Sequence, residues 1–205
     1  MRIEGALGVV HPHGDSMLLA ELAAHGPAGT ARGRALDLGT GTGYVAIELA
    51  RRGWEVDAVD VSPRALALAR RNVARNGVSV RVHASDWFDD VRGTYDVIAC
   101  NPPMRSDESE ASRLVTASLR WAPALAYRLH RLTQRALEPG RRALLLRLVD
   151  GARRHLAPGG RFLLVISARE TADLLRRVPD LRCLEARTPT RAPPGLDVVV
   201  LAFRG

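Results

Sequence analysis

The alternation of short apolar runs with amphipathic stretches is the feature that most constrains the fold of this chain. Seven runs of strand-forming residues follow one another, and stretches with helical spacing lie between the earlier ones. This alternation is typical of an α/β fold with a mostly parallel sheet and helices on both faces. The strands are expected at Ala35–Leu38, Val56–Asp60, Val78–His83, Tyr95–Asn101, Arg161–Ser167, Leu181–Ala186 and Asp197–Phe203.

The last two strands are expected to form a hairpin, which makes the end of the sheet antiparallel. They are joined by the Pro/Thr-rich segment Thr188–Gly195 instead of a helical pattern. One helix is predicted to begin at Ser62–Pro63, where a capping hydroxyl precedes a proline, and to end at Asn76–Gly77. A second runs from about Arg141 to Leu156 and stops at Ala157–Gly160.

The length and composition indicate one full-sized domain. The chain has 205 residues with 46% hydrophobic content, enough for a single α/β core. We expect an N-terminal helical lead-in at residues 1–33 and a substrate-side insert at residues 105–138. No apolar run approaches a membrane span, and Met1–Gly5 lacks the features of a signal peptide. Cys100 and Cys183 lie in apolar runs and are expected as free thiols in a cytoplasmic protein.

The positive charge of the chain has two interpretations. All 30 basic residues are arginines, so the net charge of +8 indicates an arginine-biased composition as much as a chosen partner. Ten arginines and two acids lie between Arg113 and Arg154, with Trp121 and Tyr127 among them. This segment fits a basic lid for RNA or a ribosome-associated protein. The favoured interpretation is solvated arginine faces with Trp121 in the core.

A glycine loop follows the first strand. Gly39, Gly41 and Gly43 come directly after the apolar run that ends in Asp37-Leu38, and a helical pattern follows them. Glycines let a backbone pass close to a ligand, and a helix N-terminus offers unpaired N–H groups. A dinucleotide fingerprint needs a third glycine at the position of Tyr44, so the spacing favours S-adenosylmethionine (SAM). Asp37 can orient this loop or meet the ammonium group of the ligand.

Acidic residues also follow the next two strands. Asp60 ends the second strand, where an acid accepts hydrogen bonds from ribose hydroxyls, and this role is favoured over that of a helix cap. It fits NAD as well as SAM. After the third strand, Asp86 can accept from an adenine amino group and Trp87 can lie against the ring. An ordinary cap and a packing tryptophan explain that pair equally well.

The fourth strand delivers Asn101, Pro102 and Pro103 to the same edge of the sheet. The Asn101 side-chain oxygen and the Pro102 carbonyl can accept both N–H bonds of a substrate NH2 group. That arrangement fixes a planar nitrogen toward a methyl donor and favours the positive charge that develops on it. The alternative is a strand ended by a simple Pro-Pro turn. The glycine loop and Asp60 upstream favour the functional interpretation.

These segments resemble the class I SAM-dependent methyltransferases of the HemK-like group, which includes the release factor glutamine methyltransferases. The matching segments are Asp37–Ala50, Val59–Gly77 and Ser85–Pro103, with a weaker match at Ala136–Ser167. The resemblance implies a Rossmann-like, seven-stranded, mostly parallel sheet that ends in an antiparallel hairpin. It implies SAM as cofactor, with S-adenosylhomocysteine as product.

The resemblance also implies roles for individual residues. Asp37 and the glycines would lie at the amino-acid end of the cofactor, Asp60 at its ribose, and Asp86 with Trp87 at its adenine. The residue matching Ser16 approaches the cofactor in this group. Asn101 and Pro102 would hold the substrate. The cofactor-binding residues are thus Ser16, Asp37, Gly39, Thr40, Gly41, Gly43, Asp60, Val61, Asp86, Trp87 and Asn101, and the catalytic residues are Asn101, Pro102, Pro103 and Met104.

The chain departs from the group in two respects. Met104 occupies the fourth motif position, where an aromatic residue usually stacks on the planar target. The separate N-terminal recognition domain of the bacterial enzymes is also missing, so the chain resembles the short members, some of which need a partner subunit. A partner subunit or a homodimer is therefore among the expected partners. His11 and His13 lack further ligands at metal spacing and are expected as loop residues, with no metal site.

The leading hypothesis for function is N-methylation of a glutamine side chain in a translation-related protein, such as a release factor or a ribosomal protein. The alternatives are methylation of an RNA base amino group or of a small-molecule amide or amine. A non-catalytic SAM-binding protein and an NAD-dependent reductase are the remaining hypotheses.

Overall fold

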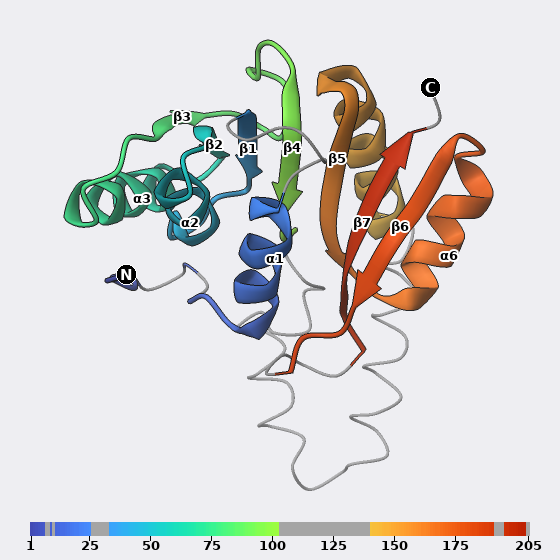
Figure 1. Cartoon of the computed structure of the whole chain (residues 1–205), viewed down its shortest axis with the longest axis horizontal. Coiled ribbons are helices and arrows are strands. Elements are labelled where there is room, and N and C mark those ends of the chain that lie inside the picture. The colour runs from blue at the N-terminus through green and yellow to red at the C-terminus, as the bar shows by residue number, and fades with distance from the viewer. Residues whose placement is uncertain (7–8, 10, 26–32, 103–139, 191–194, 204–205) are drawn as a thin grey trace, which may run out of the picture. The chain divides into compact units, whose positions relative to one another are not determined.

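A seven-stranded sheet organises the chain, with strand order β3-β2-β1-β4-β5-β7-β6 (Figure 1). The computed structural model describes residues 1–6, 9, 11–25, 33–102, 140–190 and 195–203. The pairs of β1 with β2, β1 with β4, β2 with β3 and β4 with β5 are parallel, whereas β7 pairs antiparallel with both β5 and β6. The strands are β1 (Arg34–Leu38), β2 (Glu55–Asp60), β3 (Arg81–Ala84), β4 (Tyr95–Cys100), β5 (Leu156–Ile166), β6 (Leu181–Arg187) and β7 (Asp197–Phe203). The predicted parallel sheet with an antiparallel end is confirmed.

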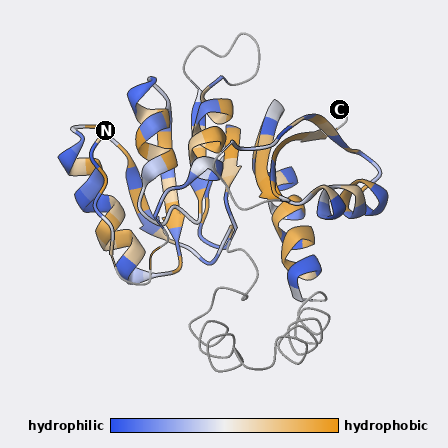
Figure 2. Cartoon of the chain, turned by 90° about the horizontal axis from the view of Figure 1, so that it is seen from below, coloured by the Kyte–Doolittle hydropathy of each residue, from blue (hydrophilic) through white to orange (hydrophobic). Residues whose placement is uncertain are grey.

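The chain divides into two units, Met1–Pro102 with Leu148–Gly205 and Pro103–Arg147. In the first unit, α1 (Gly14–Ala24) and α2 (Tyr44–Arg51) pack in one core against β1, β2, β4, β5 and β7. Residues 148–155, the last part of a helix over residues 140–155, lie behind β5 in Figure 1. Figure 2 shows the apolar residues gathered on the strands and on the helix sides that face them. Among the described residues, no helix has the length and apolar character to cross a membrane.

Helix α3 (Pro63–Arg75) begins and ends where the sequence predicts. The Ser62 side chain accepts a hydrogen bond from the Ala65 N–H, and Pro63 occupies the first turn, where its missing N–H costs nothing. Asn76 is the C-cap and Gly77 follows with a φ of +63°. That left-handed conformation suits glycine and ends the helix.

Two elements differ from the prediction because their local signals were incomplete. Strand β5 begins at Leu156, which pairs with Tyr95, and pairing resumes between Arg161 and Val97, so residues 157–160 bulge out of the strand. The predicted helix stop is therefore part of a strand. Helix α6 (Ala168–Arg177) was not predicted, although Ser167 and Glu170 form a capping box at its start.

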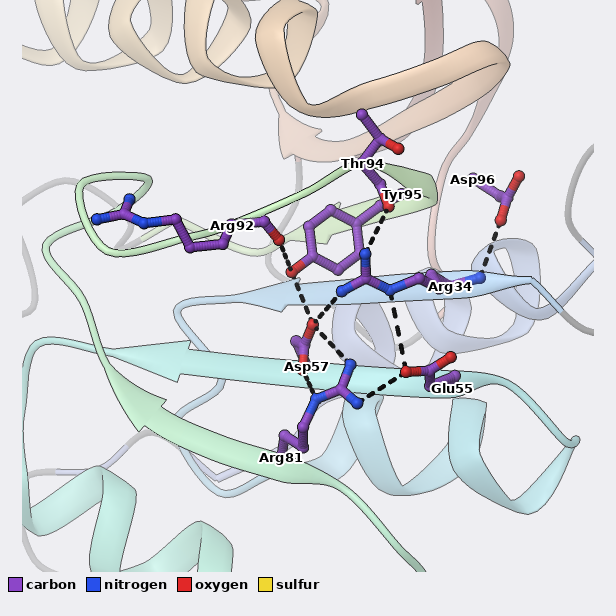
Figure 3. A network of polar contacts seen from close by, with 8 residues as sticks. All are labelled: Arg34, Glu55, Asp57, Arg81, Arg92, Thr94, Tyr95 and Asp96. Carbon is purple, nitrogen blue, oxygen red and sulfur yellow. Dashed lines mark hydrogen bonds and ion pairs between the residues drawn. The ribbon is translucent and has the colours of Figure 1, made fainter.

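Four neighbouring strands are tied together near their amino ends by the buried carboxylate of Asp57 (Figure 3). Arg34 on β1 donates to Asp57 Oδ2 at 3.0 Å, and Tyr95 on β4 donates to the same oxygen at 2.7 Å. Arg81 on β3 donates to both carboxylate oxygens, and its other terminal nitrogen reaches Glu55 at 2.7 Å. The Arg34 guanidinium also lies 4.7 Å from the centre of the Tyr95 ring.

The partners of Asp57 determine how its carboxyl group titrates. Burial alone would raise its pKa, but the hydrogen bonds from Arg81 and Tyr95 and the charges of Arg81 and Arg34 lower the pKa below the ordinary value of 3.8. A carboxyl group with a lowered pKa stabilises the fold above its unfolded-state pKa, and this contribution is lost as pH falls through the folded-state pKa. The network is therefore fully formed at neutral pH.

We predict that Asp57→Asn lowers the free energy of unfolding at pH 7 by about 2–4 kcal/mol, because two arginines lose their common buried partner. Urea denaturation at pH 7 and at about pH 3 measures the effect. The difference from the unmodified protein should shrink at the lower pH, because the unfolded chain binds a proton at Asp57 there and the contribution is partly lost.

Asp150→Asn is the matched control. Asp150 is exposed and pairs with Arg154 one helical turn away at 3.2 Å, so its loss should cost less than about 0.5 kcal/mol. Equal losses in the two variants, or a pH-independent loss in Asp57→Asn, would contradict the role of the network.

Candidate functional site

The predicted site residues meet at the carboxyl edge of the sheet because the strands that carry them are in parallel register. Leu38, the last residue of β1, pairs with Val59 of β2 and with Cys100 of β4. Asp60, the last residue of β2, pairs with Ala84 of β3. The segments that follow these strands are therefore side by side, at the edge where ligands bind in open α/β sheets.

The glycine loop between β1 and α2 is held in shape by its own backbone. Gly39, Gly41 and Gly43 have φ values of +76°, +53° and +82°, a region that other residues rarely adopt. The N–H groups of Gly39 and Thr40 both donate to the Val59 carbonyl at 2.9 Å. At Gly43, a Cβ would also lie 3.3 Å from the backbone of Ala69 on α3, so the close approach of this helix requires glycine there.

Asp37 lies beneath the loop and holds it to the start of α2. Its Oδ2 accepts hydrogen bonds from the Thr40 hydroxyl at 2.6 Å and from the Ala46 N–H at 3.1 Å. Of the two roles predicted for Asp37, these contacts support the one in which it orients the loop. The Thr40 hydroxyl is therefore used for a hydrogen bond within the protein. Burial raises the pKa of Asp37 to about 6, against the lowering effect of the two hydrogen bonds.

Asp60 links the second strand to the glycine loop. Its Oδ2 accepts from the Gly41 N–H and its Oδ1 from the Ser62 N–H, both at 2.9 Å. A carboxylate offers about four lone-pair sites, so these two contacts leave room for two further donors such as ribose hydroxyls. Val61 follows Asp60 at the same edge and is 70% exposed.

Trp87 lies beside the glycine loop. The position that a Cβ would take at Gly39 is 3.7 Å from Cζ3 of Trp87. The backbone of Trp87 has a φ of +56°, which is uncommon for a bulky residue. The Ser85 hydroxyl donates to the Trp87 carbonyl at 2.8 Å and accepts from the Asp90 N–H, and these bonds hold the turn. Asp86 is exposed in the same turn.

Asn101 is anchored by its amide nitrogen. Its Nδ2 donates to Asp15 Oδ2 at 2.9 Å and to the Ser16 hydroxyl at 3.2 Å, both in the first turn of α1. Ser16 was predicted on the cofactor side, and the structure brings it to Asn101. Asp15 was not predicted at all. Pro102 is buried, whereas Pro103, Met104 and the whole insert at residues 105–138 lie outside the described residues.

The N-terminal segment runs along α3 toward the glycine loop. The fully buried Asn72 donates to the carbonyls of Glu4 and Thr42 and accepts from the Glu4 N–H. One turn later, Asn76 exchanges the same pair of hydrogen bonds with the backbone of Arg2. Sequence reasoning gave Asn72 no role, although two asparagines four residues apart share a helix face. Val9 then lies close to the loop, 3.8 Å from where a Cβ of Gly41 would be.

We predict that Asn72→Ala destabilises the fold by about 2–3 kcal/mol, because the buried Thr42 carbonyl and the half-buried Glu4 backbone lose their partner. Asn76→Ala releases the exposed backbone of Arg2 and removes one of the two hydrogen bonds to the Asn72 carbonyl, which keeps the Asn76 N–H as a partner, so it should cost less than half as much. Urea denaturation measures both, and hydrogen exchange at the Glu4 amide should accelerate in Asn72→Ala. Similar costs in the two variants would show that the link to the glycine loop contributes nothing.

The buried carboxyl group of Asp37 makes the stability of the fold depend on pH. Because its folded-state pKa is raised from 3.8 to about 6, its favourable contribution is present below the unfolded-state pKa and is lost as pH rises through about 6. An asparagine at position 37 can still accept the hydrogen bonds from Thr40 and Ala46, because both end on the same oxygen of Asp37. Asp37→Asn should therefore gain stability relative to the unmodified protein as pH rises from about 4 to about 8, by on the order of 1–3 kcal/mol in urea denaturation. A gap that does not change with pH would contradict the raised pKa.

The chain matches the family described as "Methyltransferase small domain" over residues 12–126, more than half of its length. A release factor glutamine methyltransferase from Bordetella pertussis is 39% identical over 156 residues, which cover 74% of this chain and 54% of the relative. A ribosomal RNA small subunit methyltransferase C from Alcanivorax borkumensis is 33% identical over 91 residues, covering 44% of this chain and 28% of the relative. The chain thus spans about half the length, or less, of these relatives.

The fold also matches solved methyltransferase structures. The ribosomal protein L11 methylase from Lactobacillus delbrueckii subsp. bulgaricus superposes with a TM-score of 0.69 at 17% identity, covering 100% of this chain and 85% of that one. This likeness confirms the predicted class I methyltransferase fold. The Thermus thermophilus 16S rRNA methyltransferase RsmC, solved in complex with AdoMet, superposes with a TM-score of 0.62 at 22% identity, covering 98% of this chain and 45% of that one. The family match over residues 12–126 confirms the predicted resemblance, and the chain belongs to the methyltransferase small domain family.

Proposed function

We propose that this chain is a SAM-dependent N-methyltransferase that acts on a planar nitrogen, with a protein glutamine side chain as the leading acceptor. The observation that carries the proposal is the anchoring of Asn101 by its nitrogen. Asp15 and Ser16 accept its N–H bonds at 2.9 and 3.2 Å. In the part of the chain that the structure describes, the amide oxygen has no hydrogen-bond partner, so it can accept a hydrogen bond from a substrate at the carboxyl edge of the sheet.

The residues at this edge fit the cofactor. The glycine loop presents backbone close to any ligand above it, since Gly39 is exposed and has a positive φ. Asp60 has lone pairs left for two ribose hydroxyls. Trp87 lies against Gly39 and offers an aromatic face on the side where the adenine ring would lie.

The chemistry requires that a weak nucleophile be held in place. SAM, when bound, supplies an electrophilic methyl group, and its sulfur keeps the electron pair of the broken carbon–sulfur bond. The Asn101 side-chain oxygen and the Pro102 carbonyl accept the two N–H bonds of the acceptor and orient its lone pair. These two oxygens also favour the positive charge that develops as the nitrogen–carbon bond forms. One of the two protons then leaves the nitrogen for solvent.

Glutamine of a release factor is the leading acceptor because the Bordetella relative, which matches the larger share of this chain, is named for that activity. The alternative is an exocyclic amino group of an RNA base, which presents the same flat NH2 group. The ribosomal RNA methyltransferase relative favours it, although it matches a smaller part of the chain. A partner subunit or a homodimer is part of the proposal in either case.

We predict that the protein transfers radiolabelled methyl groups from SAM to a purified peptide-chain release factor, and less or none to ribosomal RNA or to a small-molecule extract. Asn101→Ala should reduce turnover by about 10²–10³-fold, because one of the two acceptors of the substrate N–H bonds is lost. Its affinity for SAM in titration calorimetry should stay within about threefold of the unmodified protein.

Asn76→Ala is the control for this experiment, since that asparagine is remote from the carboxyl edge and should leave turnover unchanged. Methylation of RNA alone would select the alternative acceptor. SAM binding without transfer to any of the three acceptor classes would select a non-catalytic SAM-binding protein. Binding of NADH in place of SAM would overturn the proposal.

A further inference from the structure

We propose that Asp15 is a positioning residue that determines which end of the Asn101 amide faces the acceptor nitrogen. This inference rests on the proposed N-methyltransferase function. In this role Asp15 acts through its hydrogen bond to Asn101.

The orientation of the Asn101 amide follows from the chemistry of its partner. An ionised carboxylate can only accept hydrogen bonds, so Asp15 requires the NH2 end of Asn101 to face it. The contact between Nδ2 and Asp15 Oδ2 is 2.9 Å, and Asp15 is only 7% exposed. A charge-assisted hydrogen bond in a buried position is about twice as strong as a neutral one. In the flipped orientation, the amide oxygen of Asn101 would face the Asp15 carboxylate, and two groups that only accept hydrogen bonds would lie against each other.

Both oxygens of Asp15 are engaged, which fixes the carboxylate itself. Oδ1 accepts from the Ser16 N–H at 2.8 Å, while Oδ2 accepts from Asn101. The Ser16 hydroxyl takes the second N–H of the amide at 3.2 Å. Among the described residues, the side-chain hydrogen bonds of Asn101 thus all use its nitrogen, and its oxygen is the group left for a substrate.

Helix α1 provides a rigid mount for Asp15. Leu19, Ala20 and Ala23 of this helix are buried in the core with α2 and the strands. Asp15 is in the first turn, where the helix dipole favours a negative charge. The position of the carboxylate is therefore set by the packing of α1.

Amide orientation matters because the two ends of an asparagine have nearly the same shape and opposite hydrogen-bonding character. With its oxygen outward, Asn101 accepts an N–H bond of the acceptor. With its nitrogen outward, the N–H groups of Asn101 would face the N–H groups of the methyl acceptor. The nitrogen of the methyl acceptor would then be displaced from the line of methyl transfer. Misplacement by about 1 Å can reduce a rate by about 10²-fold.

The direct test is Asp15→Asn. An asparagine at this position has only one accepting end for two donors, the Ser16 N–H and the Asn101 amide, so Asn101 is expected to flip. With release factor as acceptor, kcat should fall about 30–100-fold, while the Kd for SAM stays within about threefold. Glu21→Gln, an exposed acid on the same helix, is the matched control and should leave both values unchanged.

A double variant distinguishes orientation from general damage to the fold. In Asn101→Asp alone, two carboxylates face each other and activity should be lost. In Asp15→Asn combined with Asn101→Asp, the amide introduced on α1 would donate to the carboxylate introduced after β4, which still presents an oxygen to the acceptor. This double variant should regain at least about tenfold activity over Asn101→Asp. Wild-type kcat in Asp15→Asn, or no gain in the double variant, would overturn the proposal.

A nuclear magnetic resonance measurement tests the same point without any methyl acceptor. The side-chain NH2 signals of Asn101 are identified by their absence in Asn101→Ala. Their exchange with solvent should be at least about tenfold faster in Asp15→Ala than in the unmodified protein or in Glu21→Gln. Unchanged exchange would overturn the role of Asp15 even if the enzyme is active. Lack of methyl transfer by the unmodified protein, with the exchange difference present, would count against the proposed function alone.

Discussion

The parallel register of β1 with β2 and β4 is the constraint on which the rest of the structure depends. It brings the ends of these strands to one edge, so that the glycine loop, Asp60 and Asn101 become neighbours although they are far apart in the sequence. A shift of β4 by one residue would reverse the side on which its side chains project. Asn101 would then no longer reach Asp15 in α1, and the edge would lose the hydrogen bond that orients this amide.

The amino ends and the carboxyl ends of the parallel strands have different roles. At the amino ends of β1 to β4, the carboxylate of Asp57 joins strands through Arg34, Arg81 and Tyr95. At the carboxyl ends, polar groups are instead arranged around loops, and much of the hydrogen bonding comes from backbone N–H groups held in fixed positions. Stability from the first edge permits the second to keep costly features, such as the positive φ of Trp87.

Much of the fold could be predicted because its signals are local: apolar runs define the strands, and Ser62-Pro63 and Gly77 define the ends of α3. Helix α6 escaped prediction because it is short and rich in arginine, with a single buried residue, Leu174. The contact of Asp15 with Asn101 joins residues 86 positions apart, and no local pattern encodes such a pair. The roles of Pro103 and Met104 stay predictions.

The attachment of the N-terminal segment to α3 uses two geometries with nearly the same repeat. Four residues of a helix rise about 6 Å, and two residues of an extended chain advance about 6.6 Å. Asn72 can therefore bind Glu4 while Asn76 binds Arg2, and both asparagine side chains contact main-chain atoms only. These hydrogen bonds depend on the spacing of the segment and not on its side chains, whereas the Glu4 carboxylate adds ion pairs with Arg71 and Arg75 of α3. The asparagines therefore constrain the number of residues between the two anchor points, and the two arginines constrain the identity of residue 4.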